Sequence, residues 1–455
     1  MAAKAETVSL VGAGLNGPLL ALGLVKRGFH VEIYERRPDM RRSRISAGRS
    51  INLALSKRGI HALSEAELWD QMRQIIIPMK GRMMHSVTNE LTFQPYGKDD
   101  EEVINSISRA ELNIALMNAA EAQGVLIHFQ QRCTGIDPQK GTLQLRDGKT
   151  GTNRVLESPV VIGCDGSASA IRGEMLKQSR FNFSQQYLDY GYKELTIPAG
   201  TDGKHVLETN ALHIWPRGNY MLIALPNVDG TFACILFIPF EGPDSFTRLS
   251  TSSAVINFFH SRFPDAISLM PHLADNFFAN PTGAMVTIKC SPWHVDGRVL
   301  LLGDAAHAIV PFFGQGINCG FEDCTCLLEL VDRHGADWKR VFSQFEEMRK
   351  VNTDAIADLA VENFVEMRDR VADPRFLFRK KVELALEAKY PQLFVPKYSM
   401  VTFHRIPYAT ALKRGQLQDR MLTDLCDPIN RIEDLDWSKA ERLIRSELTP
   451  LELVS

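Results

Sequence analysis

The sequence contains 455 residues, of which 45% are hydrophobic and 23% are charged, and its formal net charge at pH 7 is −2. A chain of this length can bury a large core and is expected to divide into two or three domains. The near-neutral charge and the lack of a basic block argue against nucleic acid as the main partner. Because no run of about 18 uninterrupted apolar residues occurs, we expect no membrane-spanning helix.

Eight cysteines are spread along the chain without paired spacings. Cys324 and Cys326 lack the two-residue gap of a redox or zinc motif, and several others lie in apolar runs. Reduced, buried thiols fit this pattern and indicate a reducing compartment such as the cytoplasm. The first apolar run has neither a charged region nor a cleavage site before it, so we expect no signal peptide.

The first predicted element is a short buried strand, residues 8–11, followed by the turn Gly12-Ala-Gly14-Leu-Asn-Gly17 and a helix to Lys26. This is the dinucleotide-binding fingerprint in its usual context. Gly12 permits the tight turn, Gly14 lets the backbone approach a pyrophosphate, and Gly17 lets helix and strand pack closely. The N-terminus of the helix would face the negative charge of the ligand.

The second predicted strand, residues 30–34, ends at Glu35, eighteen residues after Gly17. A carboxylate at this place suits hydrogen bonds from an adenosine ribose and disfavours a 2′-phosphate. Taken alone, Glu35 is more typical of a solvated charge, but the preceding glycines favour the nucleotide role. Arg36 and Arg37 are typical surface charges, and Arg36 is also a candidate cofactor contact.

Farther along the chain, residues 112–123 predict an amphipathic helix, and residues 125–157 predict a strand and a meander of strands. A buried strand then ends at Asp165, and another ends at Gly303-Asp304. Two separated strands that end in aspartate indicate one sheet assembled from distant segments, with carboxylates at the edge where open α/β sheets bind ligands. A helix-capping aspartate is the alternative interpretation of Asp165.

Residues 182–293 show long alternating strands joined by turns, which predicts a mostly antiparallel sheet. Beyond Phe321 the periodicity is predominantly helical. The expected fold class is therefore α/β, with a Rossmann-like domain assembled from discontinuous segments, an antiparallel sheet domain and a helical C-terminal region. The expected boundaries are 1–181 and 296–370 for the first domain, the latter range including a long helix, 182–295 for the second and 371–455 for the third.

A second glycine-rich segment follows Pro311, where Gly314, Gly316 and Gly320 precede or open a helix. Such a segment lets backbone N–H groups lie close to a ligand at the helix N-terminus. Because no strand comes immediately before it, it is not a second dinucleotide fingerprint. His307 is a candidate base, although a packing or helix-capping histidine is the more typical role.

The fingerprint, the Asp165 element and the Gly303-Asp304 element occur in the order and spacing of the flavoprotein aromatic hydroxylases, and the chain resembles that family over roughly residues 7–410. It is most similar to the branch that hydroxylates L-kynurenine, through the strings 48–55, 191–195, 212–216, 303–323 and 398–403. The resemblance implies an FAD-dependent monooxygenase that uses NADPH and O₂. A hydroxylase of another aromatic, such as a phenol or benzoate, and a non-catalytic flavin-binding protein are the alternatives.

The resemblance also implies which residues contact FAD. Arg109 would reach the pyrophosphate or flavin as a fixed cation, although by itself it is typical of a surface charge. Asp304 would bind the ribityl chain, and backbone N–H groups at 316–318 would face the pyrimidine end of the flavin ring. The expected cofactor residues are Gly12, Gly14, Leu15, Gly17, Glu35, Arg36, Ala54, Arg109, Asp165, Asp304, Gly316, Ile317 and Asn318. NADPH would bind transiently, at residues that the sequence does not reveal.

The flavin would carry out the chemistry, so we expect no essential side-chain base and no metal. An α-amino acid substrate carries a carboxylate, which the guanidinium of Arg82 could bind in a bidentate manner. The resemblance adds Tyr96, Asn363 and Tyr398 as hydrogen-bonding partners. It also implies an apolar wall around the substrate ring, formed by Ile223, Leu225, Phe237, Pro311, Phe312, Phe313 and Met367. Taken alone, the tyrosines are more typical of amphipathic core-edge residues, Asn363 of the polar face of a helix and the apolar residues of an ordinary core.

Two departures from relatives affect these expectations. Some soluble members carry histidine where this chain has Phe313, so we expect a more apolar flavin face and no proton shuttle there. Membrane-bound members carry a C-terminal segment that is absent here. The chain is then either a naturally soluble, cytoplasmic enzyme or a truncated form of one anchored to the mitochondrial outer membrane.

Overall fold

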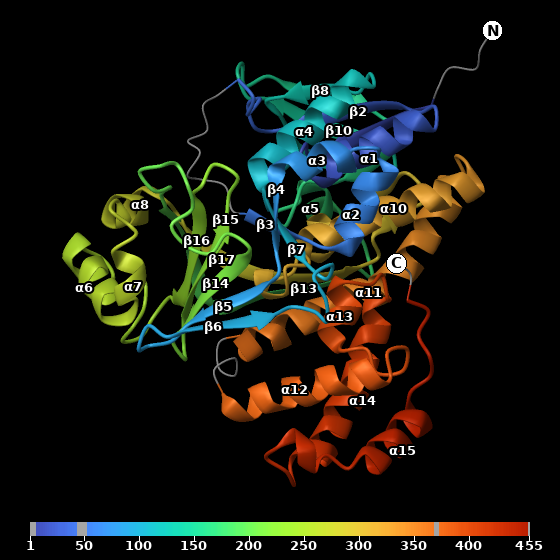
Figure 1. The fold of residues 1–455 in the computed structure, drawn as a ribbon. Helices are drawn as coiled ribbons and strands as arrows, with labels where there is room; N and C mark the ends of the chain where they lie inside the picture. Colours follow the sequence, from blue (N-terminus) through green and yellow to red (C-terminus); the bar gives the residue numbers. More distant parts are fainter. Residues whose placement is uncertain (1–5, 43–51, 368–372, 454–455) are drawn as a thin grey trace. The chain divides into compact units, whose positions relative to one another are not determined.

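The computed structural model describes residues 6–42, 52–367 and 373–453 (Figure 1). The chain forms two compact units, each assembled from three stretches of sequence. Unit 1 contains Met1–Ile76, Ile107–Leu188 and Met285–Ala357, and unit 2 contains Ile77–Ser106, Asp189–Ala284 and Asp358–Ser455. Residues 48–51, part of one string that carries the family resemblance, lie outside the described residues.

The centre of unit 1 is a six-stranded sheet with the order β18-β19-β12-β1-β2-β8. Its neighbours pair in parallel, except that the edge strand β18 is antiparallel to β19. The strands are β1 (Thr7–Val11), β2 (His30–Glu35), β8 (Leu126–Phe129), β12 (Val160–Gly163), β18 (His294–Val295) and β19 (Val299–Leu301). Segments far apart in the sequence are therefore neighbours in one parallel sheet, which confirms the predicted Rossmann-like architecture.

Two helices of unit 1, α1 (Asn16–Lys26) and α10 (Gly316–His334), pack against each other. They approach closely, because a Cβ atom at Gly23 would lie only 2.2 Å from Cδ1 of Leu328. Helix α10 ends before Gly335, whose φ of +59° suits a glycine after a helix. The other helices are α2 (Lys57–Glu65), α3 (Trp69–Met72), η1 (Arg73–Ile75), α4 (Arg109–Ala122), α5 (Ala170–Met175), α9 (Asp304–His307), η2 (Pro311–Phe313) and most of α11 (Trp338–Val365).

Two smaller sheets accompany the large ones. The predicted meander is present as an antiparallel sheet of β9 (Gln131–Asp137), β10 (Thr142–Asp147) and β11 (Asn153–Glu157). A second three-stranded sheet, with the order β3-β7-β4, was not predicted from sequence patterns. Its strands are β3 (Asn52–Leu55), β4 (Ile76–Met79) and β7 (Ile104–Ser108).

The predicted antiparallel region forms a seven-stranded sheet with the order β17-β13-β16-β15-β14-β5-β6. The chain passes between the two units within β13 and again within β17. Strand β5 pairs in parallel with β14, whereas β13–β16, β16–β15, β15–β14 and β5–β6 are antiparallel. The strands are β5 (Gly81–His85), β6 (Leu91–Pro95), β13 (Asn182–Ile197), β14 (Ala211–Pro216), β15 (Met221–Pro226), β16 (Phe232–Pro239) and β17 (Thr282–Ser291).

One face of this sheet forms a hydrophobic core with the helices α6 (Ser252–Arg262), α7 (Pro264–Ile267) and α8 (Leu273–Ala279), which are labelled in Figure 1. Leu222 and Leu236 from the sheet pack there with Phe259 and Phe263. Because side chains alternate along a strand, the neighbours of these sheet residues project from the opposite face.

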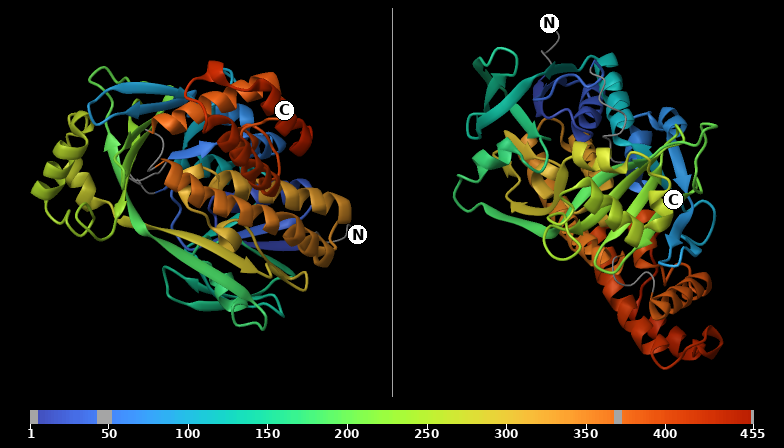
Figure 2. Two further views of the ribbon diagram at one scale, coloured as in Figure 1. Left: turned by 90° about the horizontal axis from the view of Figure 1, so that it is seen from below. Right: turned by 90° about the vertical axis from the view of Figure 1, so that its left-hand side faces the viewer.

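The C-terminal part of unit 2 is helical, as predicted, and is drawn in orange to red in Figure 2. It has its own hydrophobic core, which includes Leu386, Leu422 and Ile444. None of the described helices is both long and apolar enough to cross a membrane. The helices after α11 are α12 (Pro374–Lys389), α13 (Lys397–Thr402), α14 (Tyr408–Cys426), η4 (Ile432–Asp434) and α15 (Trp437–Glu447).

Candidate active site

The glycine-rich turn after β1 has different surroundings at each of its three glycines. Gly12 has a φ of +107°, and a Cβ atom there would lie 2.5 Å from the carbonyl oxygen of Cys164. A Cβ atom at Gly17 would lie 2.1 Å from the carbonyl oxygen of Gly12. At Gly14, by contrast, a Cβ atom would meet nothing within 4 Å. Gly12 and Gly17 are therefore required by the fold, whereas Gly14 leaves open space of the kind a pyrophosphate needs.

Glu35, at the end of β2, is buried and holds this turn in place. Its Oε2 accepts the N–H of Ala13 at 2.8 Å, and its Oε1 accepts the backbone N–H and Nε of Arg37, each at 2.8 Å. Burial raises the pKa of Glu35, but the hydrogen bonds and charge of Arg37 together with the N–H of Ala13 lower it overall. Glu35 is thus an ionised carboxylate beside the turn and not a solvated charge, and Arg37 is its partner. Leu15 is half-buried and Arg36 is exposed.

Asp165, after β12, caps a helix in the structure. Its Oδ2 accepts the N–H of Ala170 at 2.7 Å, at the start of α5, and burial raises the pKa of its carboxyl. Two turns of the site are joined by Arg172 of α5, whose Nη1 donates to the carbonyl of Ala305 at 2.7 Å. The capping interpretation of Asp165 is therefore observed directly, and a cofactor contact would be an additional role.

Asp304 follows Gly303 at the start of α9. Its side chain is accessible to solvent, yet surrounding protein atoms raise the pKa of its carboxyl by desolvation, and the nearby charge of Arg109 opposes this. Asp304 is therefore exposed, and it lies close enough to Arg109 for the two charges to interact. Arg109 is exposed in the first turn of α4, which Ser108 caps. The structure thus brings together the two charged side chains that were expected at FAD.

The N-terminus of α10 carries N–H groups that the helix does not use. Intrahelical bonding begins with the N–H of Cys319, which donates to Gln315 at 2.8 Å, so the N–H groups of residues 316–318 have no acceptor inside the helix. The buried side chain of Asn318 is engaged within the protein. It accepts the N–H of Ser56 at 2.9 Å and donates to the carbonyl of Ala54 at 2.8 Å. This segment can therefore bind a ligand through the backbone N–H groups of residues 316–318, and not through the side chain of Asn318.

These features fit an extended dinucleotide such as FAD. The open backbone at Gly14 lies at the carboxyl end of β1, and Asp304 lies just beyond the carboxyl end of β19 in the same sheet. Gly316 is similarly open, since a Cβ atom there would meet only Ile309, at 4.0 Å. A crevice at the carboxyl ends of parallel strands is where open α/β sheets bind nucleotides.

The predicted substrate anchor lies in unit 2. The guanidinium of Arg82, on β5, lies 5.5 Å from the ring centre of Tyr96 and 5.1 Å from that of Tyr398. The two tyrosine rings are stacked, with centroids 5.9 Å apart. The Nε of Arg82 is buried and has no hydrogen-bond acceptor among the described residues. The structure therefore places Tyr96 and Tyr398 around the guanidinium of Arg82, whose Nε–H has no acceptor in the part of the chain that the structure describes.

Strand register places three residues of the predicted apolar wall, Ile223, Leu225 and Phe237, on the same face of the sheet as Arg82. Arg82 pairs with Leu212 in the parallel β5–β14 ladder, and Ile214, two residues on, pairs with Ile223 of β15. Leu225, two residues after Ile223, lies on that face as well, and so does Phe237, which pairs with Met221. This face is opposite to the one covered by α6, α7 and α8. Asn363 and Met367 are buried in the same unit, whereas Pro311, Phe312 and Phe313 form η2 in unit 1.

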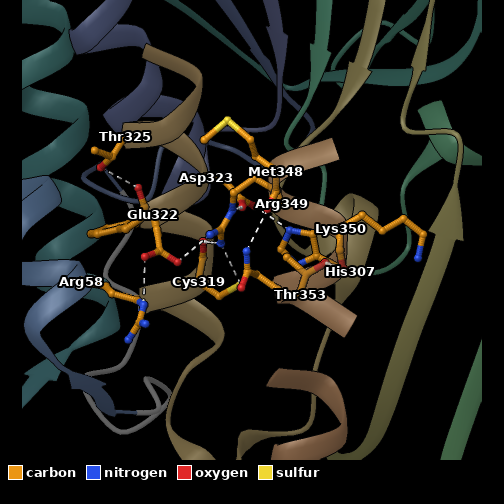
Figure 3. Close-up of polar contacts among 12 residues, drawn as sticks. Arg58, His307, Cys319, Glu322, Asp323, Thr325, Met348, Arg349, Lys350 and Thr353 are labelled. Carbon is orange, nitrogen blue, oxygen red and sulfur yellow. Dashed lines mark hydrogen bonds and ion pairs between the residues drawn. The ribbon is translucent and has the colours of Figure 1, made fainter. Parts of the chain in front are cut away.

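A buried ionic cluster, which we call the Asp323 cluster, was not anticipated from the sequence (Figure 3). Its members are Arg58, His307, Glu322, Asp323 and Arg349. Nε2 of His307 lies 2.6 Å from Oδ2 of Asp323. His307 also packs beside Trp293, so packing was predicted correctly, but the ion pair was missed. Two adjacent acids, Glu322 and Asp323, in the mostly apolar first half of this helix were the available signal.

The Asp323 cluster also bears on metal binding. His307, Cys319 and Asp323 have ligand atoms within 4.8 Å of one another. However, Nε of Arg349 donates to Oδ1 of Asp323 at 2.7 Å, and Nη2 of Arg349 lies 3.4 Å from Sγ of Cys319. The guanidinium of Arg349 therefore already supplies the positive charge that balances Asp323, and it occupies the ligand atoms that a metal ion would use.

Comparison with known proteins identifies the family. A model of the FAD-binding domain family matches residues 5–332. The chain is 54% identical over 449 residues to kynurenine 3-monooxygenase of Myxococcus xanthus, covering 98% of this chain and 97% of that protein. It is 44% identical to kynurenine 3-monooxygenase of Dictyostelium discoideum, covering 97% and 98% of the two chains.

Solved structures with the same fold include the tetrameric form of 2-methyl-3-hydroxypyridine-5-carboxylic acid oxygenase. It superposes with a TM-score of 0.68 at 21% identity and covers 83% of this chain and 96% of that chain. p-Nitrophenol 4-monooxygenase from Pseudomonas putida has a TM-score of 0.64 at 19% identity, covering 85% and 94%. At these identities the structures show the fold alone, whereas the near full-length sequence matches show that the chain belongs to the kynurenine 3-monooxygenase family of FAD-dependent monooxygenases.

Proposed function

We propose that the protein converts L-kynurenine to 3-hydroxy-L-kynurenine, with FAD as cofactor. NADPH and O₂ are consumed, one oxygen atom enters the ring and the other leaves as water. Family membership supports the reaction class. The observation that carries the substrate assignment is the buried guanidinium of Arg82, whose Nε has no acceptor among the described residues. A substrate carboxylate would supply that acceptor.

FAD, when bound, supplies the redox centre that accepts a hydride from NADPH and transfers oxygen to the ring. The residues of unit 1 would hold it in an extended form. Backbone at Gly14 approaches the pyrophosphate, and Glu35 keeps lone pairs for the ribose hydroxyls. Asp304 accepts from the ribityl hydroxyls. The N–H groups of residues 316–318 place a partial positive charge beside the pyrimidine end of the flavin.

The residues of unit 2 would orient the substrate. Arg82 binds the α-carboxylate, with Tyr96, Asn363 and Tyr398 as further hydrogen-bonding partners. The apolar sheet face with Ile223 beside this anchor receives the aromatic ring. The amino group on the substrate ring already activates the carbon ortho to it, so the site needs to position that carbon and exclude water more than it needs a strong base.

A comparison of substrates tests the assignment. Oxidation of NADPH by the FAD-loaded protein should be stimulated strongly by L-kynurenine and weakly by phenol, benzoate or a kynurenine analogue without the carboxylate. Equal stimulation by benzoate and L-kynurenine would instead make the protein a hydroxylase of simpler aromatics. FAD absorbance without stimulation by any aromatic would indicate a flavin-binding protein that is not a hydroxylase.

A further inference from the structure

The turn that presents Asp304 is bound at Gly303 by a side chain distant in sequence, that of Asp323. Gly303 has a φ of +63° and a ψ of −140°, and its carbonyl accepts the N–H groups of Ala306 and His307 at 2.8 and 2.9 Å. Its own N–H donates to Oδ2 of Asp323, in α10, at 3.1 Å. This backbone hydrogen bond is the direct link between the turn and helix α10.

The carboxylate of Asp323 is itself held at both oxygens. Oδ2 also binds Nε2 of His307 at 2.6 Å, and Oδ1 accepts Nε of Arg349 at 2.7 Å. The side chain of Asp323 has no exposed surface. With partners on both oxygens and no solvent contact, the carboxylate cannot rotate without breaking a charged hydrogen bond, so it is a rigid acceptor for Gly303.

The neighbouring Glu322 carries the same charge in the same cluster but acts elsewhere. Its Oε1 accepts Nε of Arg58 at 2.9 Å, and its Oε2 accepts Nη1 of Arg349 at 2.6 Å (Figure 3). Glu322 therefore contributes to the buried charge network through two arginines, and of the two acids only Asp323 binds the N–H of Gly303. Replacing Glu322 should therefore affect folding alone, whereas replacing Asp323 should also affect the position of Asp304.

We propose that Asp323 is a positioning residue for FAD, which fixes the Gly303 turn so that the carboxylate of Asp304 faces the ribityl chain. The inference rests on the proposed role of Asp304, and it does not depend on which aromatic the enzyme hydroxylates. His307 and Arg349 serve the same end by holding Asp323. The Asp323 cluster thus connects the helix whose N-terminus faces the flavin with the turn that binds the ribityl hydroxyls.

The test is the affinity of the apoprotein for FAD, measured by flavin fluorescence without substrate or NADPH. Asp304→Asn and Asp323→Asn should each weaken binding by about tenfold or more, as expected for a hydrogen bond to a charged group. Glu322→Gln, the matched control, should lower the melting temperature of the apoprotein but change the FAD dissociation constant by less than about threefold. The double variant Asp304→Asn/Asp323→Asn should bind no more weakly than Asp304→Asn alone, because one residue acts through the other.

Three results of the binding measurements would overturn the proposal. These are an unchanged FAD affinity in Asp304→Asn, a loss in Glu322→Gln equal to that in Asp323→Asn, and additive losses in the double variant. A measurement on the wild type covers the case in which Asp323→Asn does not fold. In the apoprotein, the labelled amide of Gly303 should exchange with deuterium at least about tenfold more slowly than an unstructured amide, because it is hydrogen-bonded to Asp323. Free exchange there would also refute the proposal.

Discussion

Arg82 is a cation that the protein surrounds with aromatic rings and leaves with a spare hydrogen-bond donor. A buried donor without an acceptor costs free energy, and a ligand that supplies the acceptor recovers it. The two stacked tyrosines stabilise the charge by cation–π contact but cannot replace a carboxylate. A buried cation with an unpaired hydrogen-bond donor is typical of a binding site and not of a structural ion pair.

Replacing Arg82 should therefore affect the substrate and not the cofactor. Arg82→Met should weaken L-kynurenine binding by about 30-fold or more, since the α-carboxylate loses its charged partner. The FAD dissociation constant should stay unchanged. A kynurenine analogue that lacks the carboxylate serves as the control ligand, and it should bind equally to wild type and variant. Unchanged affinity for L-kynurenine would remove Arg82 from the substrate site.

His307 gives a prediction about pH. Burial lowers the pKa of His307, but the negative charge of Asp323, with which it is hydrogen-bonded, raises it overall to well above its usual value. The stabilisation by this pair is fully present below the unfolded-state pKa of about 6.5 and is lost as the pH rises through the higher folded-state pKa. His307→Gln should thus lower the melting temperature by about 3 °C or more at pH 6, and the difference should shrink at alkaline pH.

Calorimetry of wild type and His307→Gln between pH 6 and pH 10 checks this prediction. A difference in melting temperature that grows with pH would show that the histidine is neutral in the folded protein. The conclusion that His307 is a buried cation, and not an available general base, would then be wrong.

At the scale of elements, the sequence patterns predicted the parts with local signals. The strand and turn at residues 8–17, the strands before Asp165 and Gly303, and the alternating strands of the antiparallel sheet all have their own periodicity or glycines. The parallel pairing of β5 with β14 could not be predicted, because it joins residues about 130 positions apart and depends on packing and not on a turn. The placement of Arg82 on the face with Ile223 therefore required the structure.

The same distinction applies to the site. Glu35 could be predicted as a carboxylate beside the glycine-rich turn, because the glycine motif precedes it at the spacing of the dinucleotide-binding fingerprint. The pair of His307 with Asp323 was missed, because a salt bridge between a turn and the middle of a helix leaves no periodic trace in a single sequence. The sequence allowed two roles for Asp165, a cofactor contact and a helix cap. The Asp-Gly motif alone could not distinguish between them.

The glycine-rich turn allows a test of one element with a matched control. Gly14→Val should fold normally, because a Cβ atom at this position meets no protein atom within 4 Å, but it should lose bound FAD because the side chain occupies the place of the pyrophosphate. Gly173→Val is the control, since a Cβ atom at Gly173 also meets nothing within 4 Å and this helix position lies outside the turn. We expect a colourless, folded Gly14→Val protein and a yellow Gly173→Val protein.

Absorbance at flavin wavelengths and circular dichroism on the purified variants make this comparison. Full FAD occupancy in Gly14→Val would contradict the assignment of this turn to the pyrophosphate. Loss of FAD from both variants would show that the effect is not specific to the turn.

At the scale of the whole molecule, the residues expected at FAD all lie in unit 1, and most of those expected at the substrate lie in unit 2. Unit 1 contains the glycine-rich turn, the exposed carboxylate of Asp304 and the first N–H groups of α10, which have no acceptor inside the helix. Unit 2 offers Arg82 and an apolar sheet face. Each unit is built from three stretches of chain, so residues far apart in the sequence come together within each of them.

Isotopic oxygen transfer tests the central claim, kynurenine hydroxylation, most directly. The FAD-loaded protein is mixed with NADPH and L-kynurenine under ¹⁸O₂, and the product is analysed by mass spectrometry. We expect 3-hydroxy-L-kynurenine that carries one ¹⁸O atom, with one NADPH oxidised for each product formed. Oxidation of NADPH that depends on L-kynurenine but yields only hydrogen peroxide, or a product without ¹⁸O, would contradict this claim.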